Sequence, residues 1–156
     1  AAWRLLPTPR PPLVVVGRVG WECDAITGAL HAAASEGWLV WLPDADDATT
    51  FRLLADARLL VYPSHWEGFG LPPLEAMQLG VPVLANDVAP LRELGDGAFA
   101  FADANEPAAL AAAIDRALRD AAWRKAACTA GRARAATFRW RDCAAAHARI
   151  YREVAG

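Results

Sequence analysis

Glu67 and Glu75 are the residues of this sequence best suited to chemistry, because they flank a glycine-containing turn. A carboxylate can accept two hydrogen bonds in one plane, which matches the vicinal hydroxyls of a ribose or a hexose. Taken alone, the two glutamates could equally be a solvated loop residue and a surface helix residue. The residues between them favour a binding site.

The segment between the glutamates combines two glycines, Gly68 and Gly70, with two consecutive prolines, Pro72 and Pro73. Glycines let backbone N–H groups approach a ligand closely, and the prolines fit the first turn of a helix. The positive end of the helix dipole then favours a phosphate. Because the segment follows an apolar run over 59–62, it should lie at the carboxyl end of a strand, where open parallel sheets bind ligands. The pattern suits a sugar–diphosphate–ribose ligand.

The apolar runs are short and almost wholly apolar, which is typical of strands buried on both faces of a parallel sheet. They cover Leu13–Val16, Trp38–Leu42, Leu59–Tyr62, Val81–Leu84 and Ala98–Phe101. Segments with helical spacing alternate with them and predict a doubly wound, Rossmann-like α/β fold. These segments cover Cys23–Glu36, Asp47–Ala57, Pro73–Leu79, Pro107–Arg119, Ala121–Ala136 and Arg141–Val154. The proline-rich start predicts a linker over 1–12, followed by one domain over 13–156.

Composition excludes several classes of protein. The net charge of −2 argues against a nucleic-acid partner, because phosphate binding needs clustered basic charge. No apolar run approaches the ~20 residues of a membrane span, and the start has no signal-peptide pattern. The three cysteines have no metal-like spacing, so we expect reduced thiols in a cytoplasmic protein.

The segment Glu67–Met77 closely resembles the Glu-x7-Glu signature of family 4 (group 1) retaining glycosyltransferases of the GT-B fold. Gly80–Asp87 is similar to the next strand of that family and the loop after it. Leu91–Ala98 is similar to the donor-loop helix and its Gly-Asp-Ala ending. Phe138–Trp140 resembles the Phe-Ser-Trp before the final helix, and Gly17–Trp21 resembles a turn of some mannosyltransferases. The resemblance covers nearly the whole chain.

The resemblance implies a role for each residue of the turn. Glu75 would bind the ribose hydroxyls of a nucleoside-diphosphate sugar, and Glu67, the catalytic candidate, would contact the transferred sugar. The backbone of Gly68, Phe69, Gly70 and Leu71 would bind the diphosphate and the sugar. The family needs no metal and no other cofactor, and it retains the anomeric configuration. The donor would be of the mannosyl type, such as GDP-mannose.

The resemblance also implies positions for the nucleotide base and the diphosphate outside this turn. Pro43 and Asp44, in the loop after the second apolar run, are the candidates for contact with the base. Gly17–Arg18 is similar to the family's Gly-Arg turn, which makes Arg18 a candidate diphosphate ligand. However, the distance from Gly17 to Ser64 fits the second strand of the family better than the first.

The family's N-terminal acceptor domain and first donor-domain strand have no counterpart here. In a doubly wound sheet that strand is central. We therefore expect either a sheet closed in the order 2-1-3-4-5, with Val14–Val16 paired to Leu60–Tyr62, or a neighbouring chain that fills the gap by self-association. Alone, the chain should transfer little sugar.

Other residues allow two interpretations. Asp44–Asp47 is similar to a metal-binding Asp-x-Asp, but Asp46 or Asp47 is better placed to cap a helix. His65 could touch the donor sugar or be merely exposed, and Trp66 could line the cleft. An arginine cluster could meet anionic lipid at the inner face of a membrane or be a solvated helix end; it comprises Arg132, Arg134, Arg139 and Arg141.

The competing functions are a non-catalytic Rossmann-like binding module, a sugar epimerase and a glycogen-synthase-like transferase.

Overall fold

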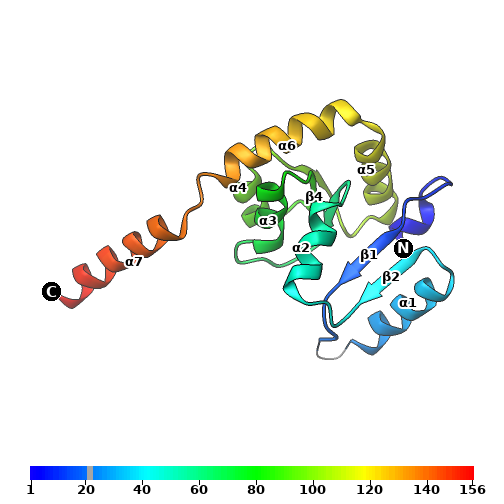
Figure 1. The fold of residues 1–156 in the computed structure, drawn as a ribbon, viewed down its shortest axis with the longest axis horizontal. Helices are drawn as coiled ribbons and strands as arrows, with labels where there is room; N and C mark the ends of the chain where they lie inside the picture. Colours follow the sequence, from blue (N-terminus) through cyan, green and yellow to red (C-terminus); the bar gives the residue numbers. More distant parts are fainter. Residues whose placement is uncertain (21–22) are drawn as a thin grey trace.

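The computed structural model describes residues 1–20 and 23–156 of the chain. Within these ranges the strands form two parallel sheets, β1-β2 and β3-β4-β5 (Figure 1). The strands are β1 Leu13–Val16, β2 Leu39–Leu42, β3 Leu60–Tyr62, β4 Val83–Asn86 and β5 Ala100–Ala102. The helices are η1 Ala2–Leu5, α1 Asp24–Ser35, α2 Asp47–Ala55, α3 Leu71–Leu79, α4 Ala89–Gly95, α5 Pro107–Arg119, α6 Ala121–Ala135 and α7 Trp140–Ala155. The predicted alternation of parallel strands and helices is confirmed.

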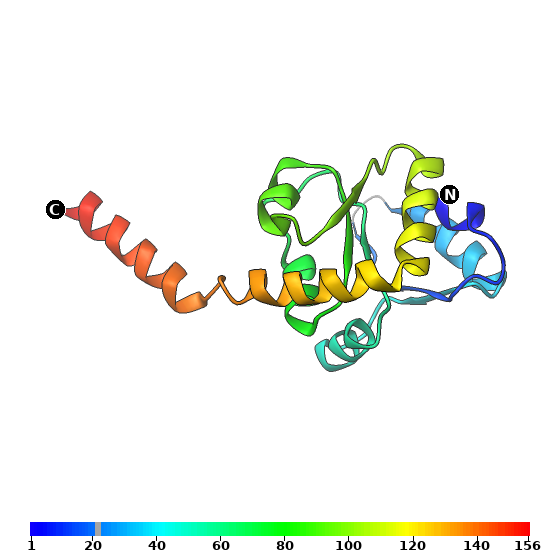
Figure 2. The same ribbon diagram turned by 90° about the horizontal axis from the view of Figure 1, so that it is seen from above.

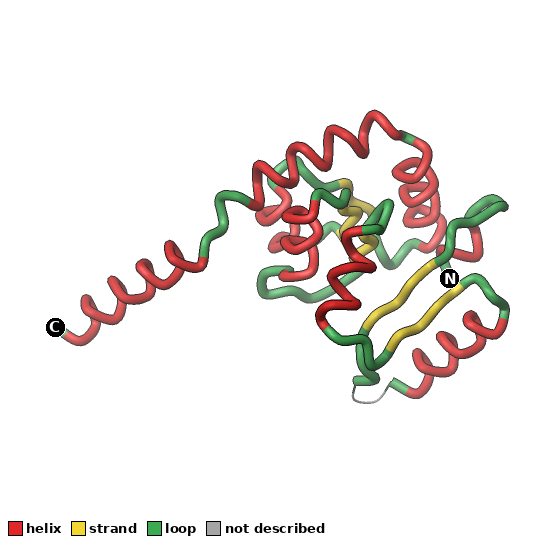
Figure 3. The backbone as a smooth tube through the Cα atoms, in the orientation of Figure 1, coloured by secondary structure: helices red, strands yellow, loops and turns green. Residues whose placement is uncertain are grey.

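The expected closure of the sheet does not occur among the described residues. β1 pairs only with β2, from Leu13 opposite Leu39 to Val16 opposite Leu42, and β3 pairs only with β4. The predicted order 2-1-3-4-5 therefore lacks the pairing of β1 with β3. Figure 3 shows the β1-β2 pair beside the part of the chain that holds the other strands. Leu13 of one sheet and Val61 of the other pack against the same apolar cluster. Side chains, not backbone hydrogen bonds, thus join the two sheets.

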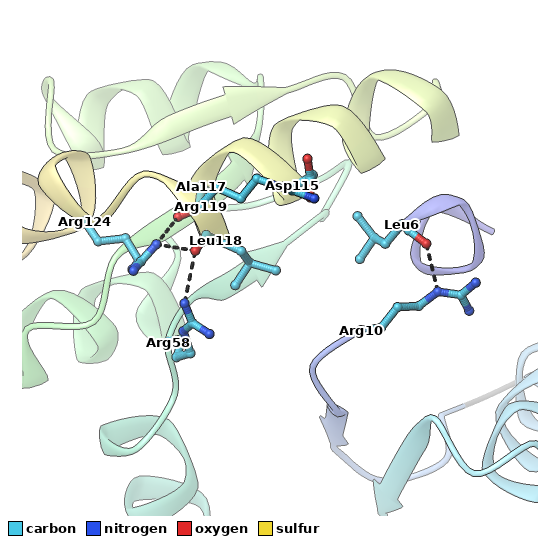
Figure 4. Close-up of polar contacts among 8 residues, drawn as sticks. All are labelled: Leu6, Arg10, Arg58, Asp115, Ala117, Leu118, Arg119 and Arg124. Atoms are coloured by element: carbon cyan, nitrogen blue, oxygen red, sulfur yellow. Dashed lines mark hydrogen bonds and ion pairs between the residues drawn. The ribbon is translucent and has the colours of Figure 1, made fainter. Parts of the chain in front are cut away.

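The first residues are part of the folded body, which corrects the expectation of a linker over 1–12. Ala2–Leu5 forms a 3-10 helix, and Trp3 and Leu6 are buried in a cluster with Ile114 of α5. Figure 4 shows Arg10 folding back so that its Nε donates to the Leu6 carbonyl, at 2.9 Å. The proline pattern correctly indicated a break after Leu6, but two large apolar side chains override it because they fill a site on α5.

Arginines satisfy the carboxyl ends of several helices. Arg58 and Arg124 both donate to the Leu118 carbonyl at the end of α5, at 3.1 and 2.5 Å (Figure 4). On α6, Arg132 donates to the Leu79 carbonyl of α3, and Arg134 donates to the Leu94 carbonyl of α4. These bonds pair carbonyls that a helix end leaves without a partner. Arg132 and Arg134 thus form hydrogen bonds within the protein that link α6 to α3 and α4.

The core lies under the β3-β4-β5 sheet, where α3 packs on α6. Met77 of α3 is buried, and a Cβ on Gly131 of α6 would lie 3.2 Å from its Cγ, so the helices approach closely. This packing fixes α3 and therefore the segment that precedes it.

By contrast, α7 extends away from the rest of the chain, and none of its residues is buried (Figures 1 and 2). No helix in the described ranges is long and apolar enough to cross a membrane.

Candidate functional site

The turn between β3 and α3 requires a glycine, Gly70, because any other residue at this position would be strained. Gly70 is buried, has a φ of 98°, and caps the amino end of α3. A Cβ on it would lie 2.9 Å from Leu91 Cδ2 and 3.2 Å from Leu94 Cδ2. Both the left-handed backbone and the close approach of α4 require glycine here.

Backbone N–H groups at this turn have no acceptor within the protein. Among the described residues, nothing accepts a hydrogen bond from the N–H of Phe69, Gly70 or Leu71. Pro72 and Pro73, the next two residues of α3, have no N–H to offer. The unpaired donors of the helix start are therefore concentrated on three consecutive residues. Phe69 and Leu71 are about half exposed, at 43% and 51%, so a ligand can reach this corner. Consecutive N–H groups without an acceptor at a helix amino end suit an anion such as a phosphate.

Glu67 is oriented by a tyrosine that the sequence did not single out. The Tyr62 hydroxyl, at the end of β3, donates to Glu67 Oε1 at 2.5 Å. Burial raises the pKa of Tyr62, and the hydrogen bond to Glu67 and the charge of that carboxylate raise it further. The Tyr62 hydroxyl is thus protonated at neutral pH and can donate to Glu67. Nothing in the described chain donates to Oε2 of Glu67, which leaves that oxygen available to a ligand hydroxyl.

Glu75 is a half-buried carboxylate that lacks any donor. No described side chain or backbone N–H forms a hydrogen bond or an ion pair with its carboxylate. Its pKa is raised, first by burial and then by the charge of Asp47 in the first turn of α2. Asp47 begins α2, and α2 packs against α3, the helix that carries Glu75. A carboxylate held in this way is stabilised when a ligand supplies hydroxyl donors.

Pro43 and Arg18 lie in neighbouring loops at the carboxyl edge of the β1-β2 sheet. The parallel register pairs Val16 with Leu42, so the loops after β1 and β2 begin side by side. Pro43 is half-buried and Arg18 is exposed. Trp21, the last residue of the mannosyltransferase-like turn, lies outside the described residues. The roles of Arg18 and Pro43 stay predictions.

Asp46 acts as a helix cap, as one interpretation of the acidic run predicted. Its carboxylate accepts from the Thr49 N–H at 2.8 Å, and hydrogen bonding to the Thr49 side chain and then to this N–H lowers the pKa of Asp46. Within 1–20 and 23–156, no three histidine, cysteine, aspartate or glutamate side chains are grouped so that they could hold a metal ion.

Asn86 is a second residue that sequence reasoning missed. It ends β4, is 5% exposed, and connects three loops at one edge of the sheet. Its Nδ2 donates to the Ser64 carbonyl at 3.0 Å, and its Oδ1 accepts from the N–H groups of Asp87 and Ala104, each at 3.0 Å. A polar residue at the carboxyl end of a wholly apolar strand was the available signal.

Replacing Tyr62 by phenylalanine should lower the free energy of unfolding by about 1 kcal/mol, because one part-buried hydrogen bond is lost. Urea denaturation measures this change. Tyr151→Phe is the matched control, since Tyr151 is 68% exposed on α7 and its loss should change little. Equal stability of the two variants would show that the bond between Tyr62 and Glu67 does not form in solution.

Comparison with known proteins identifies the family of the chain. The family model described as glycosyl transferases group 1 matches residues 1–134. The chain is 41% identical over 145 residues to the O-antigen chain mannosyltransferase B of Escherichia coli, covering 91% of this chain and 38% of that protein. It is 41% identical over 100 residues to the D-inositol 3-phosphate glycosyltransferase of Frankia alni, covering 63% of this chain and 25% of that protein. The chain thus spans less than two fifths of the length of either relative.

Solved structures of similar shape are glycosyltransferases of the GT-B fold. Sucrose-phosphate synthase from Thermosynechococcus elongatus superposes with a TM-score of 0.79 at 28% identity, covering 94% of this chain and 39% of that chain. Anabaena Alr3699/HepE, solved in complex with UDP and glucose, has a TM-score of 0.75 at 23% identity, covering 87% of this chain and 38% of that chain. With its parallel α/β fold and the match over residues 1–134, the chain belongs to the group 1 glycosyl transferases.

Proposed function

We propose that the chain binds a nucleoside-diphosphate sugar as the donor of a retaining glycosyltransferase. The observation that carries the proposal is the corner at the start of α3. There, the N–H groups of Phe69, Gly70 and Leu71 have no acceptor in the described protein, and two carboxylates flank them. The N–H groups would bind the diphosphate, Glu75 the ribose hydroxyls and Glu67 the transferred sugar.

The chemistry of transfer follows from these roles. Bonds to the N–H groups of the turn stabilise the negative charge that builds up on the departing diphosphate. The acceptor hydroxyl attacks from the side on which the diphosphate leaves, and the diphosphate takes the hydroxyl proton. The anomeric configuration is thereby retained without a carboxylate nucleophile. In this mechanism Glu67 positions the sugar through the oxygen that Tyr62 leaves available.

The donor sugar that we propose is mannose, carried by GDP. Support comes from the relatives, because the E. coli protein that is 41% identical is a mannosyltransferase. A glycogen-synthase-like activity is the second candidate, since the glycogen synthase of Bordetella parapertussis is 36% identical over 125 residues. That alignment covers 70% of this chain and 24% of the glycogen synthase.

We further propose that the acceptor binds mainly to an N-terminal domain of a longer protein, so that this chain alone transfers little sugar. A strand from that protein or from a second copy would occupy the space between β1 and β3. We propose a cytoplasmic location, at most peripheral to the inner face of a membrane.

Isothermal titration calorimetry with GDP, UDP and ADP tests the donor proposal. We expect saturable binding of one nucleotide above the other two, with GDP favoured by a mannosyl donor and another base by the glycogen-synthase-like alternative. Circular dichroism should be recorded on the same sample to show that the chain is folded. A folded chain that binds none of the three would leave the non-catalytic module as the correct description.

A further inference from the structure

A second polar pocket lies beside the segment that carries Glu67. Its volume is about 650 Å³, and loops at the carboxyl ends of three strands line it. His65 and Trp66 come from the loop after β3, residues 86–88 from the loop after β4, and Asp103 and Asn105 from the loop after β5. The volume falls in the range of small-molecule sites. Neither Glu75 nor the N–H groups of the turn line this pocket, so it is separate from the donor corner.

Hydrogen bonds of Asn86 hold the walls of this pocket in place. The Asn86 side chain ties the Ser64 carbonyl, next to His65, to the Ala104 N–H, between Asp103 and Asn105. Because Asn86 is 5% exposed, these bonds form away from water and are costly to break. The pocket is therefore built by the fold.

The lining residues favour a neutral ligand rich in hydroxyl groups. Trp66 is 92% exposed, so a ring face is open to a ligand. Asp103 Oδ1 accepts from the N–H and Nδ2 of Asn105 at 2.8 and 3.0 Å, which leaves its Oδ2 without a donor in the described chain. No lysine or arginine lines the pocket, and Asp87 is already paired with Arg92. Free carboxylate and amide oxygens attract hydroxyl donors and repel phosphates.

We propose that this pocket binds a neutral carbohydrate, the sugar end of the acceptor. The ring of Trp66 would stack on one face of the sugar, while Asp103 and Asn105 accept hydrogen bonds from its hydroxyls. The inference rests on the proposed transfer function, and it places the acceptor beside Glu67, the residue that follows Trp66. In the transfer step, an acceptor hydroxyl oxygen bonds to the anomeric carbon of the donor sugar. The bond from that carbon to the diphosphate breaks, and the hydroxyl proton passes to the diphosphate.

A two-dimensional ¹⁵N–¹H NMR titration of the chain tests the pocket. The probes are mannotriose, cellotriose and inorganic pyrophosphate, each up to about 10 mM, enough to occupy about 90% of a site whose Kd is 1 mM. A neutral saccharide should shift the amides of residues 65–66, 86–88 and 103–105. Trp66→Ala should weaken this binding at least about fivefold. Trp140→Ala is the matched control, because Trp140 is 81% exposed on α7 and its loss should leave the binding unchanged.

A parallel titration with GDP separates failure of this inference from failure of the donor proposal. Glu75→Gln should weaken GDP binding about 10- to 100-fold, as read from the concentration dependence of its shifts, and preserve the shifts caused by the saccharide. If neither saccharide shifts the pocket amides while GDP still binds, or if only pyrophosphate shifts them, the carbohydrate pocket is wrong and the donor site stands. If a saccharide binds and no nucleotide does, the pocket remains a carbohydrate site, but its role as an acceptor site is overturned.

Discussion

Glu75→Gln should weaken the binding of the preferred nucleoside diphosphate about 10- to 100-fold, while the unliganded chain becomes slightly more stable. The affinity falls because glutamine replaces two charge-assisted hydrogen bonds to the ribose with weaker ones. The stability rises because the Glu75 carboxylate is half-buried, lacks a donor and lies near the charge of Asp47. We expect a gain of no more than about 0.5 kcal/mol. Calorimetry measures the affinity, and urea denaturation measures the stability.

The pH dependence of the same variant gives a second test. The pKa of Glu75 is raised in the folded chain, so folding favours its protonated form. The cost of burying the charge is therefore present at neutral pH and disappears as the pH falls through the raised pKa. The stability advantage of Glu75→Gln should shrink over that range, and the nucleotide affinity of the wild type should fall with it. Glu93→Gln, an exposed change on α4, should alter neither quantity. If Glu75→Gln leaves the affinity for the nucleotide unchanged, then Glu75 does not bind the ribose.

Gly70→Ala should lower the free energy of unfolding by about 2–4 kcal/mol, the largest stability effect that we expect at the site. Alanine at a φ of 98° is strained, and its Cβ would lie 2.9 Å from Leu91 Cδ2. Any relaxation would also move the N–H groups at the start of α3, so nucleotide binding should weaken in the fraction that stays folded. Urea denaturation and calorimetry on the same samples measure both effects.

Gly97→Ala separates the two causes of this destabilisation. Gly97 has a φ of 87°, yet a Cβ on it would meet nothing within 4 Å. Its replacement should therefore cost only the backbone strain, about 1–2 kcal/mol, and leave nucleotide affinity unchanged. If Gly70→Ala proves no more destabilising than Gly97→Ala, then α4 does not press on the turn as closely as the structure indicates.

Local patterns in the sequence were enough to predict most elements. The wholly apolar runs identified every strand, although the observed β4 and β5 begin two residues later than the runs at Val81 and Ala98. Those two runs begin with residues that are buried but lie outside the ladder. Apolar character located the burial of β4 correctly, but the expectation of burial on both faces was wrong for β1 and β2, where Val14, Val16 and Val40 are exposed.

Long-range contacts could not be predicted in the same way. The expected pairing of β1 with β3 does not form, and both sheets instead contact the apolar cluster that contains Trp3, Leu6 and Ile114 of α5. The partners of Glu67 and Glu75 were also hidden. Tyr62 was expected to be only a strand residue, and the approach of Asp47 depends on how α2 packs against α3. The positions of the acids could be predicted from the motif, but not the groups that control their protonation and orientation.

A crystal structure of the chain with GDP or UDP tests the central claim most directly. We predict that diphosphate oxygens lie about 2.7–3.2 Å from the N atoms of Phe69, Gly70 and Leu71. The ribose hydroxyls should donate to the carboxylate of Glu75. A nucleotide bound elsewhere on the chain, with those three N–H groups facing water, would contradict the account.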